Sequence, residues 1–233
     1  MYPKLIVMDL EGTLLKKATH LDDGVVAPSA WTLLAEKLGT DALREEQATK
    51  ERWERGEYLC YVEWMRQTAE IHKKYGLNKS LFVSVLDSVE EMPGVQQAIQ
   101  SFHAHNAITV IVTGGFKYLA DRIQRNSKIY HVFAGCEYFF DPQSGSLEHW
   151  NLLPADYEGK VAFVKLIRDA YKVPRDRCAF VGDGKNDVLI AKEAGISIAF
   201  NAQQELKRAC GFSIDQQLGK ENFEAVSDLL EEV

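Results

Sequence analysis

Four short runs of consecutive apolar residues occur along the chain, and they predict buried β-strands. The runs span residues 5–8, 108–112, 178–181 and 196–200. An uninterrupted apolar run, rather than an alternation of apolar and polar residues, is typical of a strand in a parallel sheet whose two faces are both covered. A helical pattern over residues 187–194 lies between the last two runs. This alternation of strands and helices predicts an α/β fold with a Rossmann-like parallel sheet as its core.

Residues 18–90 have a different pattern, because their apolar repeats have helical spacing. A first helix is predicted from Ser29 to Gly39, and further helices over 41–55, 58–75 and 80–89. We therefore predict an α/β catalytic core of residues 1–17 and 91–233, and an all-helical cap of residues 18–90 inserted after the first strand. Four aromatic residues of the cap form its own core or face a substrate: Trp53, Tyr58, Tyr61 and Trp64.

The composition is that of an ordinary globular protein, since 46% of the 233 residues are hydrophobic and 26% are charged. The 34 acidic and 27 basic residues give a formal net charge of −7, so the field of the whole molecule repels nucleic acid and anionic membranes. We expect neither as a partner. The four cysteines form no CxxC pair, which favours a reducing, cytoplasmic location. The oligomeric state stays open.

Polar residues cluster where the predicted strands end. Such residues follow three of the runs in turn: Asp9 and Glu11, then Thr113, Gly114 and Gly115, then Asp183 and Asp187. Each alone has an ordinary explanation as a turn or helix-cap residue, but their placement after successive strands favours a single site. Ligands bind outside the carboxyl ends of the strands in an open parallel sheet. Converging carboxylates repel one another unless a cation lies between them, and a set of oxygen ligands favours Mg²⁺.

Four motifs, in this order along the chain, resemble those of the haloacid dehalogenase superfamily of hydrolases. They are Asp9-Leu10-Glu11-Gly12-Thr13, Thr113-Gly114-Gly115, Lys160, and Gly182-Asp183-Gly184-Lys185-Asn186-Asp187. Within the superfamily, residues 110–116 and the helical insertion after the first motif are most similar to the phosphoserine phosphatase branch. The resemblance implies a Mg²⁺-dependent phosphatase that hydrolyses a small phosphorylated metabolite through an aspartyl-phosphate intermediate.

The resemblance also implies a role for each motif residue. Asp9 would be the nucleophile, Glu11 the general acid and base, and Lys160 would neutralise charge on the nucleophile and the phosphoryl group. The implied Mg²⁺ ligands are Asp9, Asp183, Asp187 and the backbone carbonyl of Glu11. The implied phosphate-binding residues are Thr113, Gly114, Gly115 and Lys160, and Asn186 would orient either Lys160 or the phosphate.

Two departures from the family pattern bear on mechanism and substrate. Glu11 stands where the family usually has aspartate, and its extra methylene moves the carboxyl group by roughly one C–C bond length. Phosphoserine phosphatases have a cap glutamate after the first motif that binds the substrate's ammonium group, and Ala18 stands there in this chain. Arg66 either binds the substrate's carboxylate or is an exposed helix arginine. His20, Asp22 and Asp23 either line the substrate pocket or belong to a solvated hinge loop.

Two other functions stay open for the sequence alone. An alcohol could intercept the aspartyl-phosphate in place of water, which would make the protein a phosphotransferase. Alternatively, Glu11 could have weakened turnover, which would leave a non-catalytic protein that binds a phosphorylated metabolite. The identity of the phosphorylated substrate is not predicted, because the cap pocket depends on how its helices pack.

Overall fold

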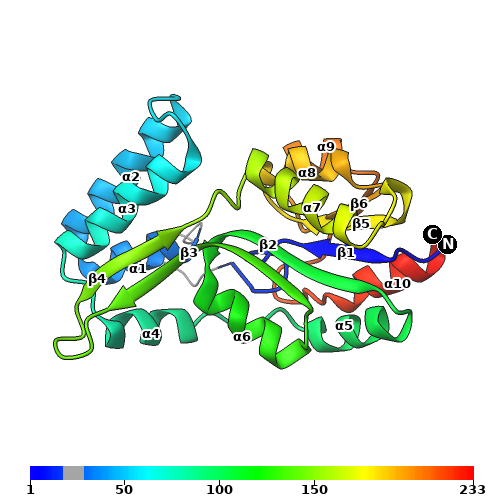
Figure 1. Cartoon of the computed structure of the whole chain (residues 1–233), viewed down its shortest axis with the longest axis horizontal. Helices are drawn as coiled ribbons and strands as arrows, with labels where there is room; N and C mark the ends of the chain where they lie inside the picture. The colour runs from blue at the N-terminus through cyan, green and yellow to red at the C-terminus, as the bar shows by residue number, and fades with distance from the viewer. Residues whose placement is uncertain (18–28) are drawn as a thin grey trace.

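A seven-stranded sheet forms the centre of the computed structural model, which describes residues 1–17 and 29–233 (Figure 1). The strand order is β4–β3–β2–β1–β5–β6–β7. The strands are β1 (Leu5–Met8), β2 (Ile108–Phe116), β3 (His131–Phe140), β4 (Leu147–Leu152), β5 (Cys178–Gly182), β6 (Ile196–Phe200) and β7 (Phe212–Ile214). Neighbouring strands run parallel, except that β3 and β4 form an antiparallel hairpin. The predicted α/β fold is confirmed. Ala18, His20, Asp22 and Asp23 lie outside the described residues.

Helices cover both faces of the sheet, which explains the uninterrupted apolar runs. On one side lie α5 (Val95–Ala104), α6 (Lys117–Ser127) and α10 (Glu224–Glu232), and on the other α7 (Glu158–Ala170), α8 (Val188–Glu193) and α9 (Gln204–Ala209) (Figure 1). Along β1, Ile6 and Met8 join one hydrophobic cluster while Leu5 and Val7 join the other. Because successive side chains of a strand point to opposite faces, a strand covered on both sides is apolar at every position.

The second strand is longer than the sequence predicts. The apolar run predicts a strand that ends at residue 112, but β2 continues through Thr113, Gly114 and Gly115 to Phe116. It pairs there with β3 after a shift in register between Thr113 and Phe116. The neighbouring strand supplies backbone partners that the sequence pattern does not reveal, so residues 113–115 form an irregular stretch of strand.

The segment between β1 and the rest of the sheet is helical over its described part, as predicted. Its helices are α1 (Ala30–Leu38), α2 (Thr40–Glu54), α3 (Tyr61–Lys74) and α4 (Lys79–Asp87). The β3–β4 hairpin reaches to these helices, and the Leu147 N–H donates to the Leu77 carbonyl at 2.9 Å. One hydrophobic cluster runs from the sheet into the insertion, from Met8 to Leu34 and Phe82. The insertion shares its core with the sheet, and the boundaries of a separate cap stay a prediction.

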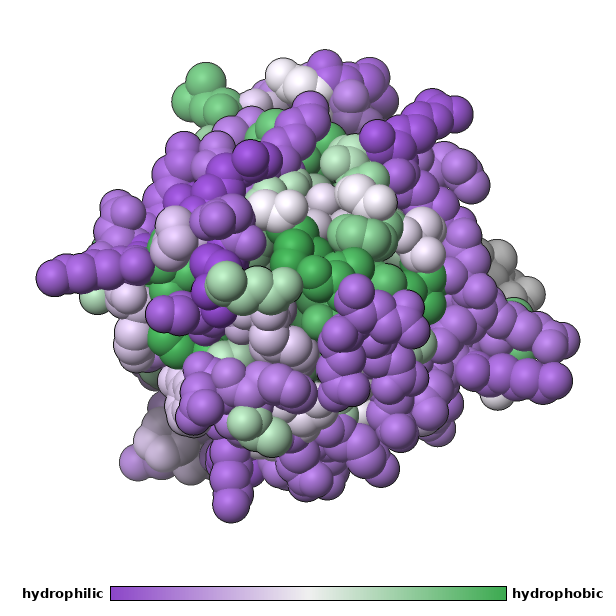
Figure 2. Space-filling view, turned by 90° about the vertical axis from the view of Figure 1, so that its right-hand side faces the viewer, coloured by the Kyte–Doolittle hydropathy of each residue, from purple (hydrophilic) through white to green (hydrophobic). Residues whose placement is uncertain are grey.

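The two ends of the sheet differ in chemistry. Both chain termini lie at the end where β1 begins (Figure 1). Figure 2 shows this end, where hydrophobic side chains are visible at the centre of the face inside a rim of hydrophilic ones. The polar carboxyl ends of the central strands lie at the opposite end, beside the helical insertion. Among residues 1–17 and 29–233, no helix is long and apolar enough to cross a membrane.

Candidate active site

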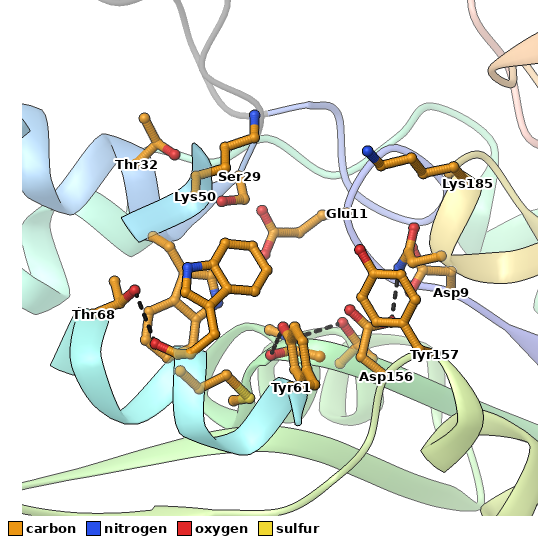
Figure 3. A pocket seen from close by; sticks show the side chains of 18 of the residues that line it. Asp9, Glu11, Ser29, Thr32, Lys50, Tyr61, Thr68, Asp156, Tyr157 and Lys185 are labelled. Carbon is orange, nitrogen blue, oxygen red and sulfur yellow. Dashed lines mark hydrogen bonds between the residues drawn. The ribbon is translucent and has the colours of Figure 1, made fainter. Parts of the chain in front are cut away.

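The carboxyl ends of β1, β2 and β5, which are neighbours in the sheet, border a cavity of about 210 Å³. Helices α1, α2 and α3 of the insertion form its opposite wall (Figure 3). The structure brings most of the predicted site residues to this cavity: Asp9, Glu11, Thr113, Gly114, Gly115, Asp183 and Asn186. Lys160 and Asp187 lie directly behind it, fully buried.

Asp9, Asp183 and Asp187 form a compact group of buried carboxylates. Each offers an oxygen that lies within 4.8 Å of the others. Asp9 follows β1, Asp183 follows β5, and Asp187 ends the short 3₁₀ turn Lys185–Asp187. Burial raises the pKa of Asp183 to about 6, because a buried carboxylate is costly without a compensating cation. Three buried oxygen donors fit a hard divalent ion such as Mg²⁺.

Gly12 lets the loop after β1 pass next to this group. Its φ of +87° lies in the left-handed region, and an added Cβ would overlap the Asp183 carboxylate. Only glycine therefore satisfies both the backbone angle and the close approach.

Lys160 supplies the buried positive charge of the site. Its Nζ lies 2.6 Å from Asp187 Oδ1, 2.7 Å from Asp9 Oδ1 and 3.5 Å from Asp156 Oδ1. Burial alone would lower the pKa of Lys160, but Asp187, Asp9 and Asp156 together raise it well above its usual value. Lys160 is therefore an ammonium ion that balances part of the acidic group.

Two residues that the sequence did not predict, Asp156 and Lys17, belong to the charged network. Asp156 lies in the bend just before α7, four residues ahead of Lys160, and its Oδ1 accepts a hydrogen bond of 2.8 Å from Asn186 Nδ2. Lys17 Nζ lies 2.7 Å from Asp183 Oδ2. Because Asp156 precedes α7, its four-residue spacing from Lys160 does not reflect a shared helix face, and the sequence pattern does not mark this residue. Nothing in the sequence pattern marks Lys17.

Glu11 connects the sheet edge to the insertion. Its Oε2 accepts a hydrogen bond of 2.7 Å from the backbone N–H of Ala30, the first residue of α1. Burial raises the pKa of Glu11 to about 7; the Ala30 hydrogen bond opposes this shift, and the charges of Asp9 and Asp183 add to it. A carboxyl group with this pKa exchanges protons readily near neutral pH.

The end of β2 forms the floor of the cavity. The Gly115 N–H donates to Thr113 Oγ1 at 3.0 Å. A Cβ on Gly114 would come within 2.5 Å of Tyr61 Oη and 2.6 Å of Asp156 Oδ2. A larger residue at position 114 would thus collide with Tyr61 and Asp156, two residues of the cavity wall.

Aromatic side chains join the insertion to the sheet edge across the cavity. Trp53 Nε1 donates to Tyr157 Oη at 3.3 Å, and the Trp53 and Trp64 rings stack with centroids 5.4 Å apart. Tyr61, Trp64 and Tyr157 line the cavity (Figure 3). Of the cap aromatics, Tyr61 and Trp64 line the cavity, and Trp53 packs against Tyr61 and Tyr157 outside its lining. Whether any of these rings contacts a substrate stays a prediction.

The structure does not bring Arg66 to the cavity. One face of α3 supplies Tyr61, Trp64, Met65 and Thr68 to the lining, at helical spacing. Arg66 lies on another face of the helix, half exposed, with its Nη1 2.6 Å from Glu70 Oε1. This arrangement agrees with the alternative of an exposed helix arginine.

Comparisons with known proteins identify the class. The family model of haloacid dehalogenase-like hydrolases matches residues 3–195, and the chain belongs to this family. It is a phosphoric monoester hydrolase of the phosphoserine phosphatase-like branch, as the sequence predicted.

Individual relatives agree with this assignment. The chain is 28% identical over 214 residues to the phosphoserine phosphatase of Lactococcus lactis, covering 91% of this chain and 90% of the relative. It is 30% identical over 141 residues to that of Idiomarina loihiensis, covering 60% of this chain and 63% of the relative. A phospho-aspartyl intermediate analogue of phosphoserine phosphatase has the same fold, with a TM-score of 0.77, 18% identity, and coverage of 98% of this chain and 99% of the other.

Proposed function

We propose that the protein hydrolyses a small phosphomonoester in two steps, with Mg²⁺ as cofactor and Asp9 as nucleophile. The observation that carries this proposal is the setting of Asp9, whose carboxylate borders the cavity and lies 2.7 Å from the Lys160 ammonium. It also lies within 4.8 Å of oxygens of two further carboxylates. The cavity of about 210 Å³ has room for a small metabolite and not for a protein segment.

The buried carboxylates would hold the metal ion. Asp9, Asp183 and Asp187 are its candidate ligands, together with the backbone carbonyl of Glu11. Bound Mg²⁺ shields the negative charges of nucleophile and phosphate from each other.

In the first step Asp9 attacks phosphorus. A bond forms between the Asp9 oxygen and phosphorus while the bond from phosphorus to the ester oxygen breaks. Glu11 gives its proton to the departing alkoxide, which leaves as an alcohol. Lys160 stabilises the negative charge that spreads over the phosphoryl oxygens in the transition state. The hydroxyl of Thr113 and the backbone at Gly114 position those oxygens.

In the second step water attacks phosphorus of the aspartyl-phosphate. Glu11, now a carboxylate, takes a proton from the water, and the bond from phosphorus to Asp9 breaks. Inorganic phosphate leaves and Asp9 is restored. Asn186 would help to position Lys160 through Asp156, because its Nδ2 donates to Asp156 Oδ1, and that oxygen lies 3.5 Å from the Lys160 ammonium. A cytoplasmic location and the absence of nucleic-acid and membrane partners stay predictions.

The test is phosphate release from a broad panel of small phosphomonoesters, with Mg²⁺ and after its removal by a chelator. We expect release of phosphate from at least one member of the panel, dependence on Mg²⁺, and none above background with Asp9→Asn. Asp169→Asn, an exposed acid on α7, is the matched control and should retain activity. Failure on every substrate, or equal activity in Asp9→Asn, would overturn the proposal.

A further inference from the structure

Glu46 is a buried carboxylate in the cavity wall that the proposed chemistry does not use. It lies on α2, is 3% exposed, and lines the same cavity as Asp9 and Glu11. Its Oε1 accepts a hydrogen bond of 3.1 Å from the hydroxyl of Thr32 on α1. Its Oε2 has no hydrogen-bond partner within residues 1–17 and 29–233. Buried polar atoms nearly always have a hydrogen-bond partner, so we expect a donor to reach this oxygen when a ligand is bound.

The surroundings of Glu46 favour a ligand as that donor. Thr32 and Thr68 also line this part of the cavity, but the Thr32 hydroxyl is already bonded to Oε1, and the Thr68 hydroxyl donates to the Trp64 carbonyl at 3.4 Å. Burial raises the pKa of Glu46, and the charge of Lys50, one helical turn further along α2, opposes this rise. Lys50 also lines the cavity, but no ion pair shorter than 4.0 Å joins it to Glu46 within the described residues. Figure 3 shows Thr32, Thr68 and Lys50 on the wall formed by the insertion, across from Asp9.

We propose that Glu46 is a specificity-determining residue, which accepts a hydrogen bond from an amino or hydroxyl group on the alcohol part of the substrate. The inference rests on the proposed phosphatase function, since the phosphate is taken to lie at Asp9. A leaving group without such a donor would leave the Glu46 oxygen buried and unpaired, which disfavours its binding. The substrate class is therefore a phosphomonoester whose alcohol carries an amino or hydroxyl group.

The test compares phosphate esters that match in length and differ at the far end. The two-carbon set is 2-aminoethyl, 2-hydroxyethyl and n-propyl phosphate, and a three-carbon set of the same design covers a longer reach. We expect kcat/KM of the unmodified protein to be at least about tenfold higher for an amino or hydroxyl ester than for the alkyl ester of equal length. Comparison of the amino ester with the hydroxyl ester shows from which donor group Glu46 accepts the hydrogen bond.

Glu46→Gln supplies the second arm of the test. The amide keeps the volume of the side chain and can still accept from Thr32, but it turns an N–H₂ group toward the ligand. We expect the preference for the amino ester over the alkyl ester to fall at least about tenfold, mainly through KM, whereas a hydroxyl ester can still accept from the amide and should lose less. Glu51→Gln, an exposed glutamate on the same helix, should keep the preference of the unmodified protein.

The outcomes separate this inference from the proposed function. No hydrolysis of any ester by the unmodified protein would contradict the phosphatase proposal itself. Hydrolysis of the alkyl esters as fast as of the donor-bearing ones would overturn the role of Glu46 and leave the phosphatase intact. An equal loss on all esters in Glu46→Gln would also overturn it, since that result indicates a structural role only.

Discussion

The two walls of the cavity are built in different ways. The sheet edge gathers the carboxylates of Asp9, Asp183 and Asp187 around the ammonium of Lys160, on positions that directly follow neighbouring strands or lie just behind them. The wall formed by the insertion consists of aromatic rings, hydroxyl groups and the carboxylate of Glu46, set by which face of each helix turns inward.

This difference suggests that the sheet edge carries out the reaction and that the helical wall selects the substrate. The dense charges of the sheet edge can act on a phosphoryl group whatever alcohol it is attached to, whereas the helical wall contacts the part of the substrate that varies. Changes at the sheet edge should therefore affect all substrates alike. Changes on the insertion side should alter selectivity or stability and leave the chemical step in place.

The largest effect is expected from Lys160→Met. Removing a fully buried ammonium leaves the carboxylates that face it without their partner, so the free energy of unfolding should fall by about 3–5 kcal/mol. Turnover should fall by at least about 10³-fold, because charge on the phosphoryl group is no longer stabilised. Urea unfolding and phosphate release measure the two effects. Lys165→Met, an exposed lysine on the same helix, should change neither; similar effects in both variants would contradict the account.

Glu11→Gln tests whether this glutamate does the work of the usual aspartate. The amide oxygen can still accept from the Ala30 N–H, so the fold should be kept. Because the amide can neither give nor take a proton, kcat should fall by about 10²–10³-fold on every substrate. Mg²⁺ affinity, measured by calorimetry, should change far less, since the implied ligand is the backbone carbonyl. An unchanged turnover rate would remove Glu11 from the mechanism.

His72 offers a test on the insertion side that concerns stability alone. It is fully buried on α3, its Nδ1 lies 2.9 Å from Tyr138 Oη, and burial lowers its pKa from 6.5 to about 4. The unfolded chain takes up a proton below pH 6.5 while the folded chain does not, so stability is lost as the pH falls from about 6.5 to about 4. The full effect is about 3 kcal/mol.

Urea unfolding across this pH range measures the loss of stability. In His72→Phe the loss on acidification should be smaller by about that amount, whereas His149→Phe, at an exposed position on β4, should behave like the unmodified protein. An equal pH dependence in both variants would show that His72 is not the group that titrates.

The smallest effect is expected where the two walls meet at the surface. Lys185 Nζ lies 3.6 Å from Glu54 Oε1 of α2, and both side chains are about half exposed. Because water and salt screen such a pair, Glu54→Gln should change the free energy of unfolding by less than about 1 kcal/mol. Its KM for any substrate should stay within about twofold. A tenfold change in KM would mean that this contact controls closure of the insertion over the site.

The contrast between the walls also explains what could be predicted from the sequence. The runs at residues 5–8 and 196–200 match β1 and β6 residue for residue, because a strand buried on both faces has a nearly continuous run of apolar residues. Asp9 and Asp183 could be expected to converge, since the ends of parallel strands meet at one edge.

The remaining site residues depend on contacts that have no local pattern. Glu46 and Lys17 reach the cavity only through the packing of segments that are separate in the sequence. The orientation of Arg66 could not be predicted either. A shift of one or two positions along α3 decides whether a residue faces the cavity or the solvent. The length of β2 depended on its pairing with β3.

The most direct test of the central claim is chemical trapping of the intermediate on Asp9. Turnover of a phosphomonoester with Mg²⁺ is quenched with borohydride, which reduces an aspartyl-phosphate to homoserine, and the chain is then mapped by mass spectrometry. We expect homoserine at position 9 only when substrate is present, and none in Asp9→Asn. Phosphate release that leaves Asp9 unmodified, or homoserine at a different aspartate, would contradict it.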